Sequence, residues 1–136
     1  MTRINIIDPE ELTDQHLVAE YREIFMVGSS LQRSLKSPNW DPTTIPEKFT
    51  LNKGHVKFFY NKGEYLHKRY LLLINEMKRR GMNPDPARKF LREQWPQDLY
   101  NDWKATAEDK VIILERINTR IAEKPDWYRY YGELLT

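Results

Sequence analysis

Residues 13–35 read TDQHLVAEYREIFMVGSSLQRSL, and this stretch decides the fold class. Thr13 has the side chain of a helix N-cap, and the residues after it follow a helical spacing. Apolar or small residues recur at steps of three and four, at Leu17, Tyr21, Ile24, Gly28, Leu31 and Leu35. Because an α-helix turns once in about 3.6 residues, these residues share one face. The stretch therefore predicts an amphipathic helix of about 20 residues.

Start and stop signals predict further helices on both sides of this stretch. The Asp-Pro pair at 8–9 predicts a short helical turn, and an Asn-x-x-Glu motif at 61–64 resembles a capping box before a second long helix. Gly81 supplies the left-handed stop of that helix. A Thr-x-x-Asp capping box at 106–109 predicts a third long helix, which ends before Pro125.

The segments between these helices carry no strand signal of useful length. Residues 37–53 contain three prolines and are predicted to be a loop, and residues 86–104 are predicted to form short helical turns. We therefore predict an all-α fold in which residues 1–136 form a single compact domain of three main helices with long connecting loops.

The composition excludes several kinds of chemistry. The 136 residues include no cysteine, which excludes a disulfide scaffold, a thiolate metal site and a cysteine nucleophile. With three histidines, an all-histidine metal site is not expected. No aliphatic run is longer than that of residues 71–74, which is too short to cross a bilayer, and residues 1–20 lack the apolar segment of a signal peptide. We therefore expect a soluble, cytoplasmic protein without a cofactor.

The formal net charge of +2 conceals an uneven distribution. Residues 1–47 carry four basic and eight acidic residues, residues 48–80 carry nine and two, and residues 81–136 carry nine and ten. A basic middle third with interleaved tyrosines is suited to binding a polyanion. The alternative is a solvated, lysine-rich helix face with some of the tyrosines in the core.

Side chains at the edges of the first apolar stripe are candidates for chemistry. On a helical wheel, His16 and Glu23 lie on the same border of the stripe, about two turns apart, and Arg22 lies on the opposite border. A carboxylate in such a place is partly desolvated, which suits acid–base chemistry. The alternative is an ordinary glutamate on the helix surface.

The N-terminus offers a second candidate. Thr2 is small enough for the initiator Met1 to be removed, which would expose the α-amine of Thr2. An α-amine has a pKa of about 7.7–8.0, so at neutral pH it is a better nucleophile than an ordinary lysine, and it forms imines. Arg3 follows and is able to bind a phosphate or a carboxylate. The alternative is an ordinary chain terminus.

The third candidate is an aromatic run near the C-terminus. Its members are Trp127, Tyr128, Arg129, Tyr130 and Tyr131. Such a run serves either as a stacking or groove-wedging surface or as a segment that packs on the helices. On the preceding helix, Arg116 and Arg120 share one face, which favours either phosphate contacts or simple solvation.

Several blocks of this sequence, in order along the chain, resemble one known family. They are Met1-Thr2-Arg3-Ile4-Asn5, DQHLxAEYRE at 14–23, GHVxFFY at 54–60, Lys68-Arg69, and the region from Arg116 to PxWYxYYG at 125–132. The chain resembles the phage pyrimidine-dimer DNA glycosylases known as endonuclease V.

The resemblance implies a compact all-α enzyme that excises UV-induced cyclobutane pyrimidine dimers from double-stranded DNA, as a monomer and without a metal. In that family the free amine of Thr2 attacks C1′ of the damaged nucleoside, displaces the base and forms an imine. Glu23 is the key carboxylate. β-Elimination then nicks the strand, which is the abasic-site lyase activity.

The resemblance also implies which residues bind the DNA. Those assigned to phosphates near the lesion are Arg3, Arg22, Arg116 and Arg120. Those of the C-terminal DNA-facing and packing segment are Trp127, Tyr128, Arg129, Tyr130 and Tyr131. His16 would position the sugar or the amine. Met26 stands where the phage enzyme has an arginine, which bears on lesion binding and on the preferred photoproduct.

Two alternatives remain open at this point. The chain could be a non-catalytic DNA-binding protein of the same fold, which keeps the basic residues and dispenses with the amine. It could also be a glycosylase for another damaged base. The imine mechanism further requires the removal of Met1, because the Thr2 nitrogen is otherwise part of an amide.

Overall fold

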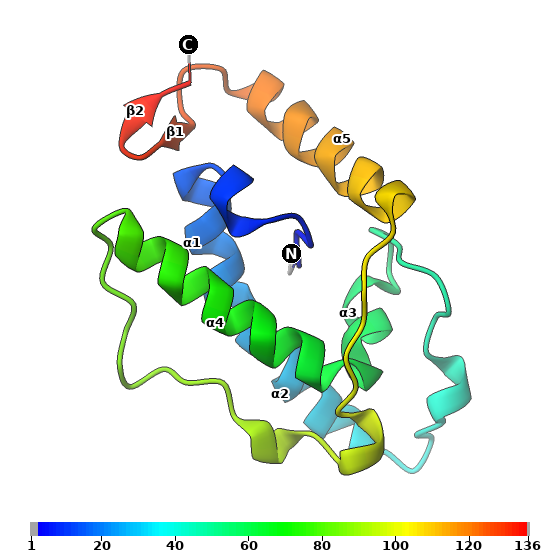
Figure 1. Ribbon diagram of the computed structural model, residues 1–136. Helices are drawn as coiled ribbons and strands as arrows, with labels where there is room; N and C mark the ends of the chain where they lie inside the picture. The colour runs from blue at the N-terminus through cyan, green and yellow to red at the C-terminus, as the bar shows by residue number, and fades with distance from the viewer. Residues whose placement is uncertain (1–2, 136) are drawn as a thin grey trace.

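The computed structural model describes residues 3–135, and its regular structure in that range is mainly helical (Figure 1). The helices are α1 (Asp14–Glu23), α2 (Phe25–Leu35), α3 (His55–Phe58), α4 (Gly63–Arg79) and α5 (Ala107–Glu123). Short 3₁₀ turns lie at Pro9–Glu11, Pro42–Thr44, Phe59–Asn61, Arg92–Gln94 and Gln97–Leu99. A small hairpin of β1 (Arg129–Tyr130) and β2 (Glu133–Leu134) follows α5. The all-α prediction is confirmed. None of the described helices is long and apolar enough to span a membrane.

The long helix predicted over residues 13–35 is present as α1 followed directly by α2. Thr13 caps α1, because its Oγ1 accepts the amide hydrogen of His16. The backbone stays in the right-handed helical region at Ile24, but the amide of Val27 bonds three residues back to the carbonyl of Ile24, as in a 3₁₀ turn. This local tightening divides the helix in two without a loop.

The capping box predicted at 61–64 is wrong. Asn61 belongs to a 3₁₀ turn, so α4 begins later, at Gly63, with Lys62 as its N-cap and no side-chain cap bond. The Asn61 carboxamide oxygen instead accepts from Lys62 Nζ at 2.8 Å. Glycine is required at position 63, because a Cβ atom there would lie 2.7 Å from the ring of Trp95.

The other predicted helix signals are confirmed. The side chain of Asp8 accepts from Glu10 N and caps the first 3₁₀ turn. Gly81 has a φ of +80°, as the left-handed stop after α4 requires. Thr106 and Asp109 exchange both bonds of a capping box at the start of α5, at 3.1 and 3.0 Å.

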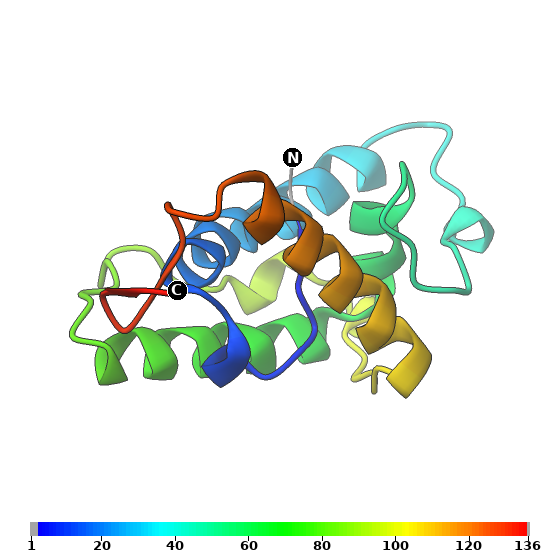
Figure 2. The ribbon, with the colours of Figure 1, turned by 90° about the horizontal axis from the view of Figure 1, so that it is seen from above.

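The N-terminal segment runs through the middle of the molecule. Figure 1 shows it between α4 and α5, beside α1, and Figure 2 shows the same segment from above with α5 over it. Its side chains Ile4 and Ile6 are buried in the same apolar cluster as Leu17 of α1, Leu73 of α4 and Ile113 of α5. The described start of the chain therefore lies inside the fold, where α1 and α5 face each other.

The C-terminal hairpin was not predicted from the sequence, because its strands are too short to show an alternating pattern. Arg129 pairs with Leu134 across the hairpin, and the turn residues Tyr131 and Gly132 both have positive φ angles, 51° and 81°. Asp14 of α1 accepts hydrogen bonds from both turn amides, at 3.1 and 2.8 Å. The hairpin is thus fixed to the start of α1.

Candidate active site

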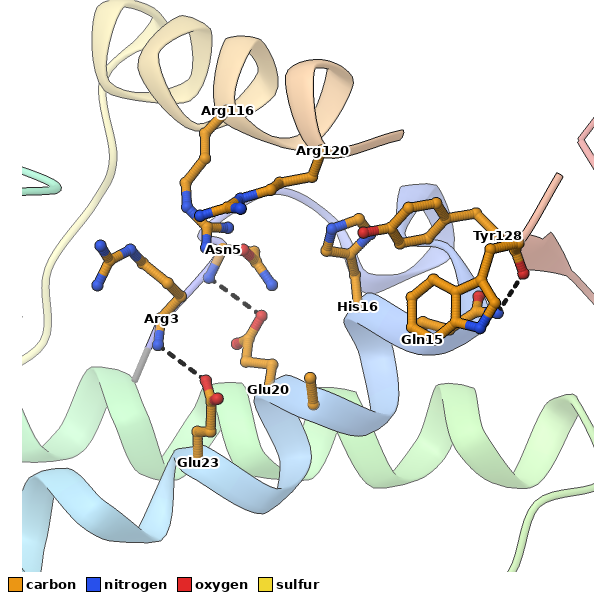
Figure 3. Close-up of a pocket in the computed structure, with 11 residues that line it drawn as sticks. Arg3, Asn5, Gln15, His16, Glu20, Glu23, Arg116, Arg120 and Tyr128 are labelled. Atoms are coloured by element: carbon orange, nitrogen blue, oxygen red, sulfur yellow. Dashed lines mark hydrogen bonds between the residues drawn. The ribbon is translucent and has the colours of Figure 1, made fainter. Parts of the chain in front are cut away.

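A cavity of about 230 Å³ lies where the N-terminal segment, α1, α5 and the C-terminal segment meet (Figure 3). The wall contains residues that the sequence analysis selected: Arg3, His16, Glu23, Arg116, Arg120, Trp127 and Tyr128. It also contains Asn5, Gln15, Ala19 and Glu20. Residues far apart in the sequence are therefore brought to one site, and Thr2 itself lies outside the described residues.

Two carboxylates of α1 face the N-terminal segment (Figure 3). Glu23, which is half-buried at the end of α1, accepts a hydrogen bond on Oε2 from the backbone amide of Arg3 at 3.0 Å. Glu20, one turn earlier, accepts from the amide of Asn5 on Oε1 at 3.0 Å. The two carboxylates thus bind alternate amides of the segment. Within residues 3–135, no group of three or more metal-ligating side chains is placed to hold a metal ion.

Three guanidinium groups line the same cavity. Arg3 comes from the N-terminal segment, and Arg116 and Arg120 extend toward it from α5 (Figure 3). Burial lowers the pKa of Arg3, the nearby Glu23 opposes that shift, and Arg120 adds to it. Burial, followed by the charges of Arg3 and Arg120, lowers the pKa of Arg116. Guanidinium groups stay protonated near neutral pH, so an anion in this cavity would relieve their mutual repulsion.

His16 is held as a neutral imidazole in the cavity wall. Its Nδ1 is hydrogen-bonded to Thr13 Oγ1 at 2.6 Å, and the same hydroxyl accepts the His16 amide hydrogen at 3.0 Å. Burial first, and then the charge of Arg116, lowers the pKa of His16 to about 4. Tyr128 stacks on the ring with 4.9 Å between centroids. At neutral pH, His16 is therefore a neutral imidazole in a fixed position rather than a cation.

A family model described as pyrimidine dimer DNA glycosylase matches residues 1–90, more than half of the 136-residue chain. The chain belongs to the pyrimidine dimer DNA glycosylase family. It is therefore a DNA repair enzyme, as the resemblance implied. The matched range includes Arg3, His16 and Glu23, whereas α5 and the C-terminal segment lie beyond it.

Sequence reasoning missed two buried residues of the glycosylase pocket, Asn5 and Glu20. Asn5 Oδ1 is buried and has no hydrogen-bond partner within residues 3–135. Glu20 forms a buried ion pair with Arg69 of α4, with 2.6 Å between Glu20 Oε2 and Arg69 Nε. Two signals pointed to Glu20, namely its position one turn before Glu23 and its place in the block at 14–23 that carries the resemblance, but nothing local connects it to Arg69.

A third residue missed in the sequence, Gln15, anchors the C-terminal segment of the glycosylase beside the pocket. Its Nε2 donates to the carbonyl of Trp127 at 2.7 Å, and its Oε1 accepts from the amide of Arg129 at 2.9 Å. These two bonds bracket Tyr128, the residue whose ring stacks on His16. The aromatic segment is therefore partly a packing element.

Four residues selected from the sequence, Arg22, Arg129, Tyr130 and Tyr131, do not line the glycosylase cavity. Arg22 is exposed and lines a neighbouring groove of about 400 Å³ together with Trp127. Arg129 is exposed in the hairpin, where its guanidinium bonds to a turn carbonyl. Tyr130 donates its hydroxyl hydrogen to the carbonyl of Glu10 at 2.6 Å, which is a packing contact. Tyr131 likewise donates its hydroxyl hydrogen to Glu76 Oε2 at 2.8 Å. Of these four residues, Arg22 and Arg129 keep exposed cations beside the pocket.

Some arginines of the basic middle third, residues 48–80, form ion pairs within the glycosylase itself. These arginines bind acids of the N-terminal third, in the pairs Arg69–Glu20, Arg79–Glu10 and Arg80–Asp14, at 2.6, 3.1 and 3.0 Å. The interpretation of this third as a polyanion footprint does not hold for Arg69 and Arg80, whose side chains are buried, whereas Arg79 is exposed. The cations of the pocket come instead from the first and last thirds of the chain.

Proposed function

We propose that this pyrimidine dimer DNA glycosylase acts as a monomer on double-stranded DNA and that the α-amine of Thr2, freed by removal of Met1, is its nucleophile. The enzyme excises a cyclobutane pyrimidine dimer through an imine and then nicks the strand by β-elimination. The observation that carries this proposal is the hydrogen bond from the amide of Arg3 to the carboxylate of Glu23.

Chain connectivity makes Glu23 suited to serve that amine. In any polypeptide, an α-amine lies within about 4 Å of the amide nitrogen of the next residue. Here the amide nitrogen of Arg3 is 3.0 Å from Glu23 Oε2. A carboxylate this close to residue 3 is within reach of a proton on the amine of residue 2, directly or through one water.

The proposed reaction balances around this pair. The neutral amine attacks C1′, the C1′–N glycosidic bond breaks, and the damaged pyrimidine leaves with the bonding electrons. Glu23 carries a proton from the new ammonium to O4′ as the sugar ring opens, which leaves a protonated imine between the Thr2 nitrogen and C1′. Loss of a proton from C2′ then expels the phosphate from C3′. Hydrolysis of the imine frees the amine.

The charge of the cavity supports a phosphate beside the reacting sugar. Arg3, Arg116 and Arg120 face the site, while the negative charge of Glu20 is paired with Arg69. The cavity therefore has an excess of positive charge even with Glu23 ionised. Guanidinium groups bind phosphate with charge-assisted hydrogen bonds, and they stabilise the negative charge of the leaving phosphate.

The neutral state of His16 fits a role in holding the sugar. Its Nε2 can hydrogen-bond to a sugar hydroxyl, while Nδ1 is bonded to Thr13. Because Tyr128 covers one face of the ring, the ring plane is fixed before DNA binds. This arrangement supports a positioning role for His16 and argues against proton transfer by it at neutral pH.

Borohydride trapping tests the imine. Protein that begins at Thr2 and matched protein that retains Met1 are each incubated with a duplex containing one cyclobutane dimer. We expect a covalent adduct only from the processed protein, mapped by mass spectrometry to Thr2. Strand cutting without an adduct would contradict the imine mechanism, and an uncut dimer duplex would support the non-catalytic DNA-binding alternative. Parallel duplexes with alkylated or oxidised bases test the other alternative.

Replacement of Glu23 separates binding from chemistry. Glu23→Gln should bind the dimer duplex as the unchanged protein does and lose about 10²–10⁴-fold in cutting rate, because the proton carrier is gone. Glu115→Gln, on the exposed surface of α5, is the matched control and should leave both unchanged. Full cutting by Glu23→Gln would remove Glu23 from the mechanism.

A further inference from the structure

The N-terminal segment is held by three consecutive backbone amides. The amide of Arg3 donates to Glu23 Oε2 at 3.0 Å, that of Ile4 to His55 Nε2 at 2.9 Å, and that of Asn5 to Glu20 Oε1 at 3.0 Å. Residues 3–7 lie in neither a helix nor a strand, so these buried amides depend on side chains for their hydrogen bonds. The acceptors come from α1 and α3, so two helices fix one short stretch of chain.

The acceptor in the middle, His55, is fixed in one orientation and one tautomer. It is 1% exposed, and the rings of Phe49 and Phe59 meet it edge-on. Its Nδ1–H donates to the carbonyl of Thr50 at 2.8 Å, which leaves Nε2 as an acceptor for the amide of Ile4.

The electrostatics of this site keep His55 neutral. Burial, the largest effect, lowers the pKa of His55 to about 4, although the carbonyl of Thr50 opposes the shift. Among the charged groups around the ring, Arg3 and Arg116 lower the pKa further and Glu20 raises it. At neutral pH, Nε2 is therefore free to accept a hydrogen bond.

The segment is also bent sharply next to this contact. Ile6 has a φ of +47°, which a β-branched residue rarely adopts, and the amide of Ile7 bonds back to the carbonyl of Asn5. The buried Glu20–Arg69 pair binds both sides of the bend, because Glu20 accepts from Asn5 N and Arg69 donates to Ile7 O. Because the bend is held on both sides, the residues before it have a fixed direction.

We infer that His55 is a positioning residue for the reaction, which holds the amide of Ile4 so that the α-amine of residue 2 and the carboxylate of Glu23 stay aligned. The inference rests on the proposed function, in which that amine is the nucleophile. Misplacement of a reacting group by about 1 Å costs as much as 10²-fold in rate. A chain terminus is tethered by the backbone on one side only, so the amide contacts of the next residues contribute to its alignment.

Two conservative substitutions separate the two hydrogen bonds of His55. Gln places an amide group near the position of Nε2 and keeps an acceptor for Ile4 N, whereas Asn places it near Nδ1 and keeps only a donor for Thr50 O. Both are polar and similar in size to histidine. A purely structural role would affect both through stability alone, but a positioning role distinguishes them.

The measurement is the single-turnover rate of borohydride-trapped adduct formation on an abasic-site duplex, with the DNA affinity measured in parallel. We expect His55→Asn to slow trapping by about 10- to 100-fold with little change in affinity, and His55→Gln to stay within about threefold of the unchanged protein. The matched control is His67→Gln. His67 lies on α4 outside the pocket, where it is hydrogen-bonded to Tyr100, so the trapping rate of this variant should not change.

The possible outcomes test this inference apart from the proposed function. Absence of any adduct from the unchanged, processed protein overturns the amine mechanism, and the inference with it. A normal adduct from the unchanged protein together with equal rates for His55→Asn and His55→Gln overturns the inference alone. The ¹⁵N–¹H resonance of Ile4 gives a second readout, because it should move strongly in His55→Asn and little in His55→Gln.

Discussion

At the scale of single residues, the Glu20–Arg69 pair shows how a buried charge is tolerated in this enzyme. The side chains are 0% and 3% exposed, so both have lost their hydration. Arg69 binds Glu20 through Nε and Nη2 at 2.6 and 2.9 Å, and the remaining partners are Asn5 N and Ile7 O. Burial acts to lower the pKa of Arg69, but the charge and hydrogen bonds of Glu20 outweigh it and raise that pKa.

Removal of the cation from this pair should be costly. Arg69→Met keeps the length of the side chain but leaves Glu20 buried without a counter-charge, which should lower the free energy of unfolding by about 3–5 kcal/mol. Urea denaturation measures this loss. The control is Lys68→Met, since Lys68 is 60% exposed and its surface ion pairs should contribute little to stability. Similar small losses in the two variants would show that the pair is not important for folding.

At the scale of elements, the C-terminal hairpin depends on contacts outside itself. A two-residue ladder is too short to be stable alone. Arg80, whose side chain is 0% exposed, lies under the rings of Tyr130 and Tyr131 at 4.7 and 4.8 Å and pairs with Asp14 and Glu76. The hairpin in turn continues from Tyr128, which covers His16 in the pocket.

The role of Arg80 in anchoring the hairpin can be tested directly, because its buried side chain cannot contact DNA. Arg80→Lys keeps the charge but loses the planar fork, so it cannot satisfy both carboxylates and the two rings. We expect amide hydrogen exchange in residues 128–134 to speed up about tenfold or more, and the affinity for dimer DNA to fall several-fold. Arg79→Lys, on the exposed neighbour, should leave both unchanged. Unchanged exchange in Arg80→Lys would show that the hairpin does not depend on this arginine.

The helix ends show which features could be predicted from the sequence. The caps at Thr13 and at Thr106–Asp109 and the stop at Gly81 were predicted correctly, because each is a contact within one turn of chain. The cap at Asn61 was predicted wrongly, because a 3₁₀ turn takes that residue. The bonds that build the site, such as His55 to Ile4 across 51 positions, leave no local pattern. The pocket residues were selected from helical spacing, residue chemistry and the family resemblance together, and the residues that support them were not selected.

At the scale of the whole molecule, buried histidines should make stability depend on pH. His16 and His55 both have pKa values lowered to about 4 by burial, against an ordinary value of about 6.5. Between these values the unfolded chain binds more protons than the folded one. The contribution of each histidine to stability is therefore complete above about pH 6.5 and is lost as the pH falls toward 4.

Unfolding in urea at several pH values measures this effect. Between pH 6 and 5, the free energy of unfolding should fall by up to about 1.4 kcal/mol per pH unit for each histidine. The His55→Gln variant has only His16 left in this role, so its slope should be about half as steep. Carboxylates with lowered pKa values, such as Glu76, titrate below about pH 4.5, so they do not affect the slope between pH 6 and 5. A flat profile between pH 6 and 5 would contradict the neutral, buried state of both rings.

The charge of the whole molecule sets how salt should affect DNA binding. The net charge of +2 is small because 22 basic residues nearly balance 20 acidic ones. In the middle third, Arg69 and Arg80 are buried and bound to acids of the first third, so they are not available to DNA. The cations proposed to contact phosphates are the three in the pocket and two beside it: Arg3, Arg116, Arg120, Arg22 and Arg129. Five phosphate contacts predict a slope of log K against log salt of about −4 to −5.

Arg116→Ala should make that slope shallower by about one and weaken binding to damaged and undamaged duplexes alike, because a phosphate contact carries no sequence information. Arg79→Ala also removes one positive charge, but Arg79 is already paired with Glu10 and Glu76. The salt slope of this variant should therefore match that of the unchanged protein. If Arg79→Ala lowered the slope as much as Arg116→Ala, net charge rather than the pocket would govern binding.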